Sequence, residues 1–219
     1  MSMNLKGVVW AVSFASAFAV ATIPVHALTV TDSTFGTFDA SSGLRPLTIP
    51  GAPSTLITDV DITIQFAKCD DPAQTVFSPT CSGGTSGGTA FSFNREIVFR
   101  LSSPLGTTVS LIEQNTYSGQ QPGHGVVIHF DQSASAAVGG PNLAGGDFRP
   151  VGNLGLFNGQ LAEGTWKLFI QDTAAQDPLS YFRSTLVVNG AQQVPAPASL
   201  ALLALGLTVL GAVCRKRKA

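Results

Sequence analysis

Apolar and polar side chains alternate along residues 59–66, and this alternation constrains the fold more than any other feature of the chain. Val60, Ile62, Ile64 and Phe66 occupy every second position, with aspartate, threonine or glutamine between them. A period of two is typical of a β-strand with one buried and one wet face, whereas a helix needs a period near 3.6. The segment therefore predicts a half-buried strand.

Further strands are predicted between breaks rich in glycine, proline and aspartate. They cover residues 97–101, 109–111, 126–130, 165–171 and 181–188. The 23 glycines and 13 prolines among 219 residues suit a loop-rich β protein, and no helical periodicity with caps occurs between Leu28 and Gln193. Short strands with frequent turns favour an all-β sandwich or barrel.

The N-terminus has the three parts of a secretory signal peptide. Lys6 precedes an apolar run over residues 7–23, and Val25-His26-Ala27 ends in a small residue. We expect signal peptidase to remove residues 1–27, so that the mature chain starts at Leu28. An uncleaved membrane anchor is the alternative.

The C-terminus has the features of a second targeting signal. An apolar run over residues 200–213 follows a proline-rich segment and precedes a basic cluster, and residues 198–214 are barely long enough to span a bilayer. Positive charge after such a helix holds the C-terminus in the cytoplasm. The residues that flank the run are Val194, Pro195, Ala196 and Pro197 before it, and Arg215, Lys216, Arg217 and Lys218 after it.

This tail, residues 191–219, resembles the PEP-CTERM sorting signal of Gram-negative bacteria. The signal usually reads Val-Pro-Glu-Pro-Ala-Ser before the helix, and here Ala196 replaces the glutamate. The resemblance implies transient retention in the inner membrane, cleavage by an exosortase-type enzyme, and release to the cell surface or an exopolysaccharide matrix. A plain anchor that stays in place is the alternative.

Two cysteines, Cys69 and Cys81, lie in the expected mature region. An even number of cysteines in an exported protein predicts a disulfide, and closing a loop of this size stabilises the fold by roughly 3 kcal/mol. A metal-binding pair is the weaker alternative, because neither histidine nor a third cysteine lies nearby in the sequence.

A second resemblance covers Ile57–Asn189. Six short segments occur in the order found in the P domain (Homo B domain) that follows subtilisin-like catalytic domains: Ile57–Ile64, Leu101–Thr107, Phe130-Asp131, Phe148–Pro150, Leu154–Gly159 and Gly164–Asp172. The resemblance implies a jelly-roll-like β-sandwich over residues 57–190, with an inserted loop at 68–89. Residues 28–56 would then form an N-terminal extension, with an edge strand at 28–31. The tryptophan of the family's last strand is absent, and Phe182 is the nearest aromatic residue.

The sequence argues against an enzyme. Gly84-Thr85-Ser86-Gly87-Gly88 fits the nucleophile-elbow pattern, but it lies in a low-complexity loop without the strand and helix that an elbow requires. His124 and His129 have no partner at the spacing of a catalytic triad. We therefore expect both histidines to be structural or surface residues.

Calcium is the one cofactor that the acidic residues suggest. Glu96, Asp131, Asp172 and Asp177 lie at predicted strand ends or in adjacent loops, and Ca²⁺ takes six to eight oxygen ligands. P domains often carry Ca²⁺, so the resemblance supports a site formed by these four residues. Ordinary turn-capping aspartates are the alternative.

The charge balance excludes one class of partner. Leu28–Pro195 contains seven basic and thirteen acidic residues, a net charge of −6, and has no basic stripe to neutralise phosphates. We therefore expect no nucleic acid partner.

Two functions fit these features. The first is an exported non-enzymatic module with a structural, adhesive or glycan-associated role, whose partners are exopolysaccharide or surface proteins. The second is an accessory, either stabiliser or inhibitor, of a secreted subtilisin-like protease or another hydrolase.

Overall fold

The computed structural model describes residues 25–51, 55–81 and 91–192, and in these ranges it is built from strands. They contain no α-helix, only the short 3-10 helices η1 (Asn94–Glu96) and η2 (Leu154–Phe157). The strands are β1 (Val25–Asp32), β2 (Gly36–Phe38), β3 (Ser42–Ile49), β4 (Thr55–Lys68), β5 (Phe91–Phe93), β6 (Ile97–Ser102), β7 (Thr108–Ile112), β8 (Gln120–Pro122), β9 (His124–Phe130), β10 (Gly146–Phe148), β11 (Gly164–Asp172) and β12 (Leu179–Gln192). The predicted all-β class is confirmed.

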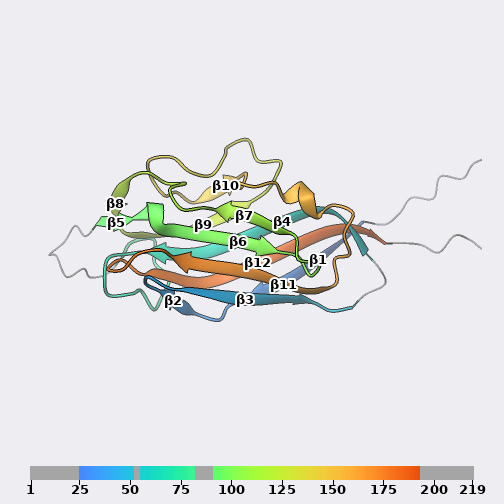
Figure 1. Cartoon of the computed structure of the whole chain (residues 1–219), viewed down its shortest axis with the longest axis horizontal. Helices are drawn as coiled ribbons and strands as arrows, with labels where there is room; N and C mark the ends of the chain where they lie inside the picture. Colours follow the sequence, from blue (N-terminus) through green and yellow to red (C-terminus); the bar gives the residue numbers. More distant parts are fainter. Residues whose placement is uncertain (1–24, 52–54, 82–90, 193–219) are drawn as a thin grey trace, which may run out of the picture.

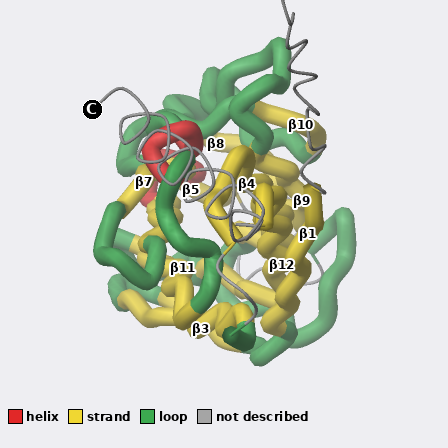
Figure 2. Tube along the Cα trace, turned by 90° about the vertical axis from the view of Figure 1, so that its right-hand side faces the viewer, coloured by secondary structure: helices red, strands yellow, loops and turns green. Residues whose placement is uncertain are grey.

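These strands form two main sheets in a sandwich-like arrangement. The β4 sheet has the order β1-β12-β4-β9-β10, with β2 also paired to β12, and the β11 sheet has the order β3-β11-β6-β7. Strands β5 and β8 form a separate ribbon. Figure 2 looks along the strands and shows β3, β11 and β7 on one side, with β4, β12, β9 and β1 on the other. Among the pairings between the named strands, only β9–β10 is parallel.

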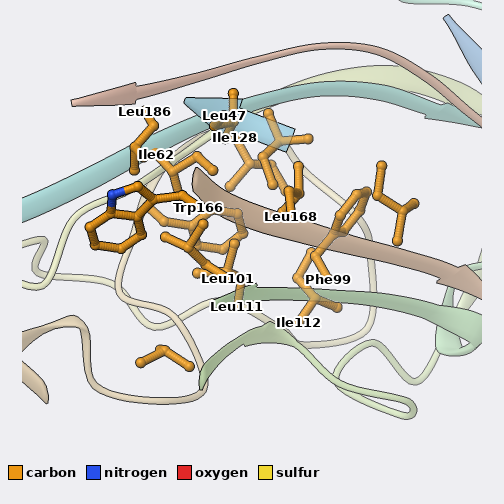
Figure 3. Packing of buried hydrophobic residues seen from close by; sticks show 14 of the residues in the cluster. Leu47, Ile62, Phe99, Leu101, Leu111, Ile112, Ile128, Trp166, Leu168 and Leu186 are labelled. Atoms are coloured by element: carbon orange, nitrogen blue, oxygen red, sulfur yellow. The ribbon is translucent and has the colours of Figure 1, made fainter. Parts of the chain in front are cut away.

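The core fills the space between the two sheets. The alternation predicted for residues 59–66 is confirmed, since Val60, Ile62, Ile64 and Phe66 are at most 1% exposed. In the close view, side chains of the β4 sheet lie opposite those of the β11 sheet (Figure 3). Those labelled are Ile62, Ile128 and Leu186 from the first, and Leu47, Phe99, Leu101, Leu111, Ile112, Trp166 and Leu168 from the second.

The sandwich begins earlier than the P-domain resemblance places it. Residues 28–51, expected as part of an extension, supply β1, β2 and β3, of which only the strand near 28–31 was predicted. Strand β3 pairs with β11 at the edge of its sheet and buries Leu47 and Ile49. The sequence pattern does not predict this strand, because Pro46 lies within it. Proline usually interrupts a strand but is tolerated at a sheet edge.

Both ends of the described sandwich lie at one end of the molecule. Val25 pairs with Ala191 and Thr55 with Gln192, whereas Lys68 pairs with Leu179 at the opposite end (Figure 1). We call these the terminal end and the loop end. Cleavage after Ala27 would remove three residues of β1 and leave the pairs from Leu28–Val188 onward. The rest of the predicted signal peptide lies outside the described residues, as does the predicted membrane helix.

The turn between β6 and β7 packs against the first residue of β11. Two backbone hydrogen bonds close the turn. The N–H of Gly106 donates to the oxygen of Ser103 at 2.9 Å, and the N–H of Ser103 donates to the oxygen of Thr107 at 2.8 Å. Gly164 has a φ of +117°, and a Cβ atom there would lie 2.8 Å from Pro104 Cβ. Both the backbone conformation and the close contact therefore require glycine at position 164.

Replacing Gly164 by alanine should destabilise the domain. We expect the free energy of unfolding to fall by about 1–3 kcal/mol, the cost of a strained backbone and an overpacked contact. Gly51→Ala is the matched control, since a Cβ at Gly51 meets no atom within 4 Å, and its effect should stay within about 0.5 kcal/mol. Urea denaturation measures both variants. Equal stabilities would contradict the packing role of Gly164.

Candidate functional site

A buried lysine, which the sequence analysis did not single out, organises the loop end. Lys68 is the last residue of β4 and is completely buried. It continues the inward positions of Ile62, Ile64 and Phe66, so its side chain points into the core where an apolar residue is expected. A charge at the next inward position of an alternating strand is the signal that could have revealed this site.

Three of the four predicted calcium ligands surround the Lys68 ammonium group. Nζ lies 2.7 Å from Asp172 Oδ2, 3.1 Å from Glu96 Oε2 and 3.2 Å from Asp177 Oδ2. It also donates a hydrogen bond to the backbone oxygen of Asp177. The carboxylates come from β11, η1 and the loop before β12, so one ammonium group ties the β4 strand to the facing sheet.

The carboxylates have further partners in the backbone. Asp172 accepts hydrogen bonds from the N–H groups of Leu179 and Ala174, at 3.1 and 3.4 Å, and Asp177 accepts one from Phe93. A buried charge is tolerated only when it is paired and hydrogen-bonded in this way.

The titration of the cluster reflects its burial. Burial lowers the pKa of Lys68, but the nearby charges, Asp172 foremost, outweigh it and raise the pKa above its ordinary value. Burial raises the pKa of Asp172 and of Asp177 to about 6, although the Lys68 charge opposes this.

A pocket of about 210 Å³ opens beside the cluster at the loop end. Glu96 and Asp177 line it together with Asp70, Phe91, Phe93, Arg95, Ala175 and Gln176. The Arg95 guanidinium lies 5.3 Å from the centre of the Phe93 ring, within the range of a cation–π contact. The pocket thus combines three carboxylates, one guanidinium and two aromatic rings.

Asp131, the fourth predicted ligand, lies elsewhere. It follows Phe130, which pairs with Ile62, six residues along β4 from Lys68, or roughly 20 Å at the rise of a strand. Its carboxylate accepts hydrogen bonds from the backbone and hydroxyl of Ser133. The four residues therefore do not form one site, and the described residues include no group of His, Cys, Asp or Glu arranged to hold a metal ion. Calcium binding stays a prediction.

The predicted disulfide is confirmed. Cys69, directly after Lys68, is bonded to Cys81 and closes the loop between them. This loop packs onto β9, where a Cβ at Gly125 would lie 2.3 Å from the backbone oxygen of Ser78 and 2.8 Å from the Phe77 ring. Gly125 thus lets the loop approach the sheet closely.

The two histidines of the sandwich make local contacts. His124 hydrogen-bonds through a ring nitrogen to the backbone oxygen of Leu143, at 2.9 Å. His129 lies on the outer face of the β4 sheet, 3.1 Å from the exposed carboxylate of Asp147. Ser86 lies outside the described residues.

A depression and an aromatic group occupy the outer face of the β4 sheet. The depression has a volume of about 320 Å³ and is lined by Thr63, Gln65, Val127, Arg183 and Thr185. Phe182 lies where the pairing of β12 with β4 is shifted between Tyr181 and Arg183, and its ring centre is 5.6 Å from those of Phe35 and Phe77. The sequence analysis noted Phe182 but none of the residues that line the depression.

Comparison with known families confirms the sorting tail. Residues 193–218 match the PEP-CTERM protein-sorting motif, which contains the predicted signal residues from Val194 to Lys218. The motif indicates an exported protein with a membrane-anchored sorting tail that an exosortase-type enzyme recognises. These residues lie outside the described ranges, and within those ranges no helix is long and apolar enough to cross a membrane.

Two solved structures resemble the sandwich distantly. The crystal structure of FLHE is similar at 13% identity and a TM-score of 0.39, covering 76% of this chain and 97% of FLHE. A structure of the Gx strain of infectious bursal disease virus is similar at 11% identity and a TM-score of 0.33, covering 83% of this chain and 37% of that one. No curated protein matches the chain. Likenesses this weak carry no argument about function, and the P-domain resemblance stays a prediction.

The stability of the domain should fall as the pH rises from 5 to 7. Because Asp172 and Asp177 have pKa values near 6 when folded and near 3.8 when exposed, the folded state binds more protons in this window. The free energy of unfolding then decreases with rising pH, by about 1–2 kcal/mol in total. Urea denaturation at both pH values measures the change.

A matched pair of variants tests whether the carboxylates around Lys68 cause this pH dependence. Asp177→Asn should reduce the pH dependence, because it removes one of the titrating carboxylates, whereas Asp71→Asn, at an exposed position in the loop that Cys69 and Cys81 close, should leave it intact. A wild-type domain that is more stable at pH 7 than at pH 5 would refute the account of the cluster.

Proposed function

We propose that this chain is an exported, non-enzymatic β-sandwich module with a structural, adhesive or glycan-associated role. Its tail delivers it to the surface or the exopolysaccharide matrix of a Gram-negative bacterium. The observation that carries the proposal is the sorting motif at 193–218, which begins directly after β12, the last described strand. Signal peptidase, an exosortase-type enzyme and the inner membrane are the partners during export.

The geometry of the sandwich is compatible with a C-terminal membrane tail that is later removed by proteolytic cleavage. The tail follows Gln192, which pairs with Thr55 at the terminal end. The membrane tether therefore leaves the sandwich at the terminal end, opposite the loop end. Cleavage near Pro195–Pro197 leaves every described strand in place, so release does not cost the domain its fold.

The polar groups of the core support a non-enzymatic role. Lys68 is ion-paired with the carboxylates of Asp172, Glu96 and Asp177 and is itself fully buried, which suits a structural ion-pair network. His124 is engaged by a backbone oxygen. We assign these residues to stability and not to catalysis.

We also propose that the sandwich is a jelly-roll-like domain similar to the P domain. Two segments that carry that resemblance have defined roles here. The Ser103–Thr107 turn packs against Gly164, and Trp166 is fully buried with its ring 4.9 Å from that of Phe157. These contacts explain why a glycine and a tryptophan stand at the start of β11.

The route of export predicts the mass of the released protein. In its native host, the shed protein should start at Leu28 and lack residues 200–219. In a host without its exosortase, the protein should stay in the membrane fraction and keep those residues. Intact-mass spectrometry of both fractions measures this. A tail that is retained in both hosts would leave a plain anchor as the explanation.

The proposed destination is tested on the same cultures. We expect the released protein to be recovered with the cell surface or with sedimented exopolysaccharide. Recovery of all of it as free protein in the medium would contradict a role at the surface or in the matrix.

A further inference from the structure

The depression on the outer face of the β4 sheet combines hydroxyl, amide and guanidinium groups. Thr63 and Thr185 lie opposite each other on β4 and β12, and Gln65 lies opposite Arg183 in the same register. Together with Val127, these side chains line the volume of about 320 Å³. Arg183 has no ion-pair partner among the described residues, so its five donors are available to a ligand.

An aromatic surface adjoins this depression. Phe182 immediately precedes Arg183, and its shifted position brings its ring to that of Phe35, at an interplanar angle of 43°. Phe77, from the disulfide-closed loop, also contacts the Phe182 ring, nearly edge-on at an interplanar angle of 78°. Phe35 is 42% exposed, so part of this aromatic surface is open to solvent.

We propose that this face binds a polysaccharide of neutral pyranose sugars, with Phe35 and Phe182 as the stacking surface. A pyranose ring has weakly positive C–H groups on its faces, which complement the negative face of an aromatic ring. Its rim carries hydroxyl groups, which pair with the guanidinium of Arg183, the amide of Gln65 and the threonine hydroxyls. The inference rests on the proposed function, which brings the chain to the polysaccharide.

Charge selects a neutral ligand over a polyanion. The same face carries Asp59 and Asp61 further along β4 and Asp147 on β10, and Leu28–Pro195 has a net charge of −6. Burial, followed by the charges of Asp59 and Asp131, raises the pKa of Asp61 to about 6. A uniformly acidic chain laid along the face would meet this repulsion.

Affinity electrophoresis of the mature protein tests the proposal. The probes are galactomannan, xyloglucan and mixed-linkage β-glucan dissolved in native gels, with alginate as the anionic polymer. We expect retardation by at least one neutral polymer and none by alginate. Binding of the neutral polymer should persist in 0.5 M salt. At about 0.1 M salt the screening length is already ~10 Å, so roughly five times that concentration screens most interactions between exposed charges.

Matched variants locate the site. Phe35→Ala and Arg183→Ala should each weaken binding by roughly tenfold, the effect of removing a central contact. Phe91→Ala, at another exposed phenylalanine, and Lys167→Ala, at an exposed cation on the β11 sheet, should bind like wild type. Unchanged melting temperatures establish that Phe35→Ala and Arg183→Ala are folded.

The outcomes separate this inference from the proposed function. Retardation by no neutral polymer, or equal retardation of all four variants, overturns the binding face even if the protein is recovered from the matrix. Retardation by alginate that salt abolishes overturns the neutral ligand. Failure of the proposed function would appear instead as a protein that binds neutral polymer in the gel but never reaches the surface or the matrix.

Discussion

The buried ammonium group of Lys68 holds the loop end of the sandwich together. It is the point where β4, the end of β11, η1 and the loop before β12 meet, through contacts of 2.7 to 3.2 Å to three carboxylates. Removing Lys68 from this network would be strongly destabilising, because it would leave three carboxylates without their counter-charge. The hydrophobic core closes the middle of the sandwich, whereas an ionic contact closes this end.

The proposed binding face depends on that contact through two short connections. Cys69 follows Lys68 directly, and its bond to Cys81 closes the loop that presents Phe77 to Phe182. On the other side, Leu179 pairs with Lys68 and donates to Asp172, which fixes the start of β12 three residues before Phe182. The stability of the loop end and the proposed binding face thus depend on the same Lys68 contact.

The sequence predicts the long central strands, misses the edge strand β3 and the short strands β2, β5, β8 and β10, and predicts the site only in part. The alternation of apolar and polar residues is enough to predict β4, because each inward residue is apolar up to Phe66. The even number of cysteines is enough to predict the disulfide. Proximity of Glu96, Asp172 and Asp177 follows from their positions at strand ends, but the cation among them is Lys68, which periodicity alone places in the core. Asp131 is separated because strand pairing puts the preceding residue, Phe130, opposite Ile62. Phe35 and Phe77 lie in loops, so only the tertiary fold brings them to Phe182.

The central claim is that a membrane-sorted sandwich presents a sugar-binding face near its loop end. Amide chemical shifts of ¹⁵N-labelled mature protein, titrated with xyloglucan oligosaccharides and galactomannan oligosaccharides, test it most directly. The account predicts that the largest shifts occur at Phe35, Thr63–Gln65 and Phe182–Thr185. Shifts confined to the outer face of the β11 sheet, around Leu44 and Phe169, or to the pocket beside Phe91, would contradict it.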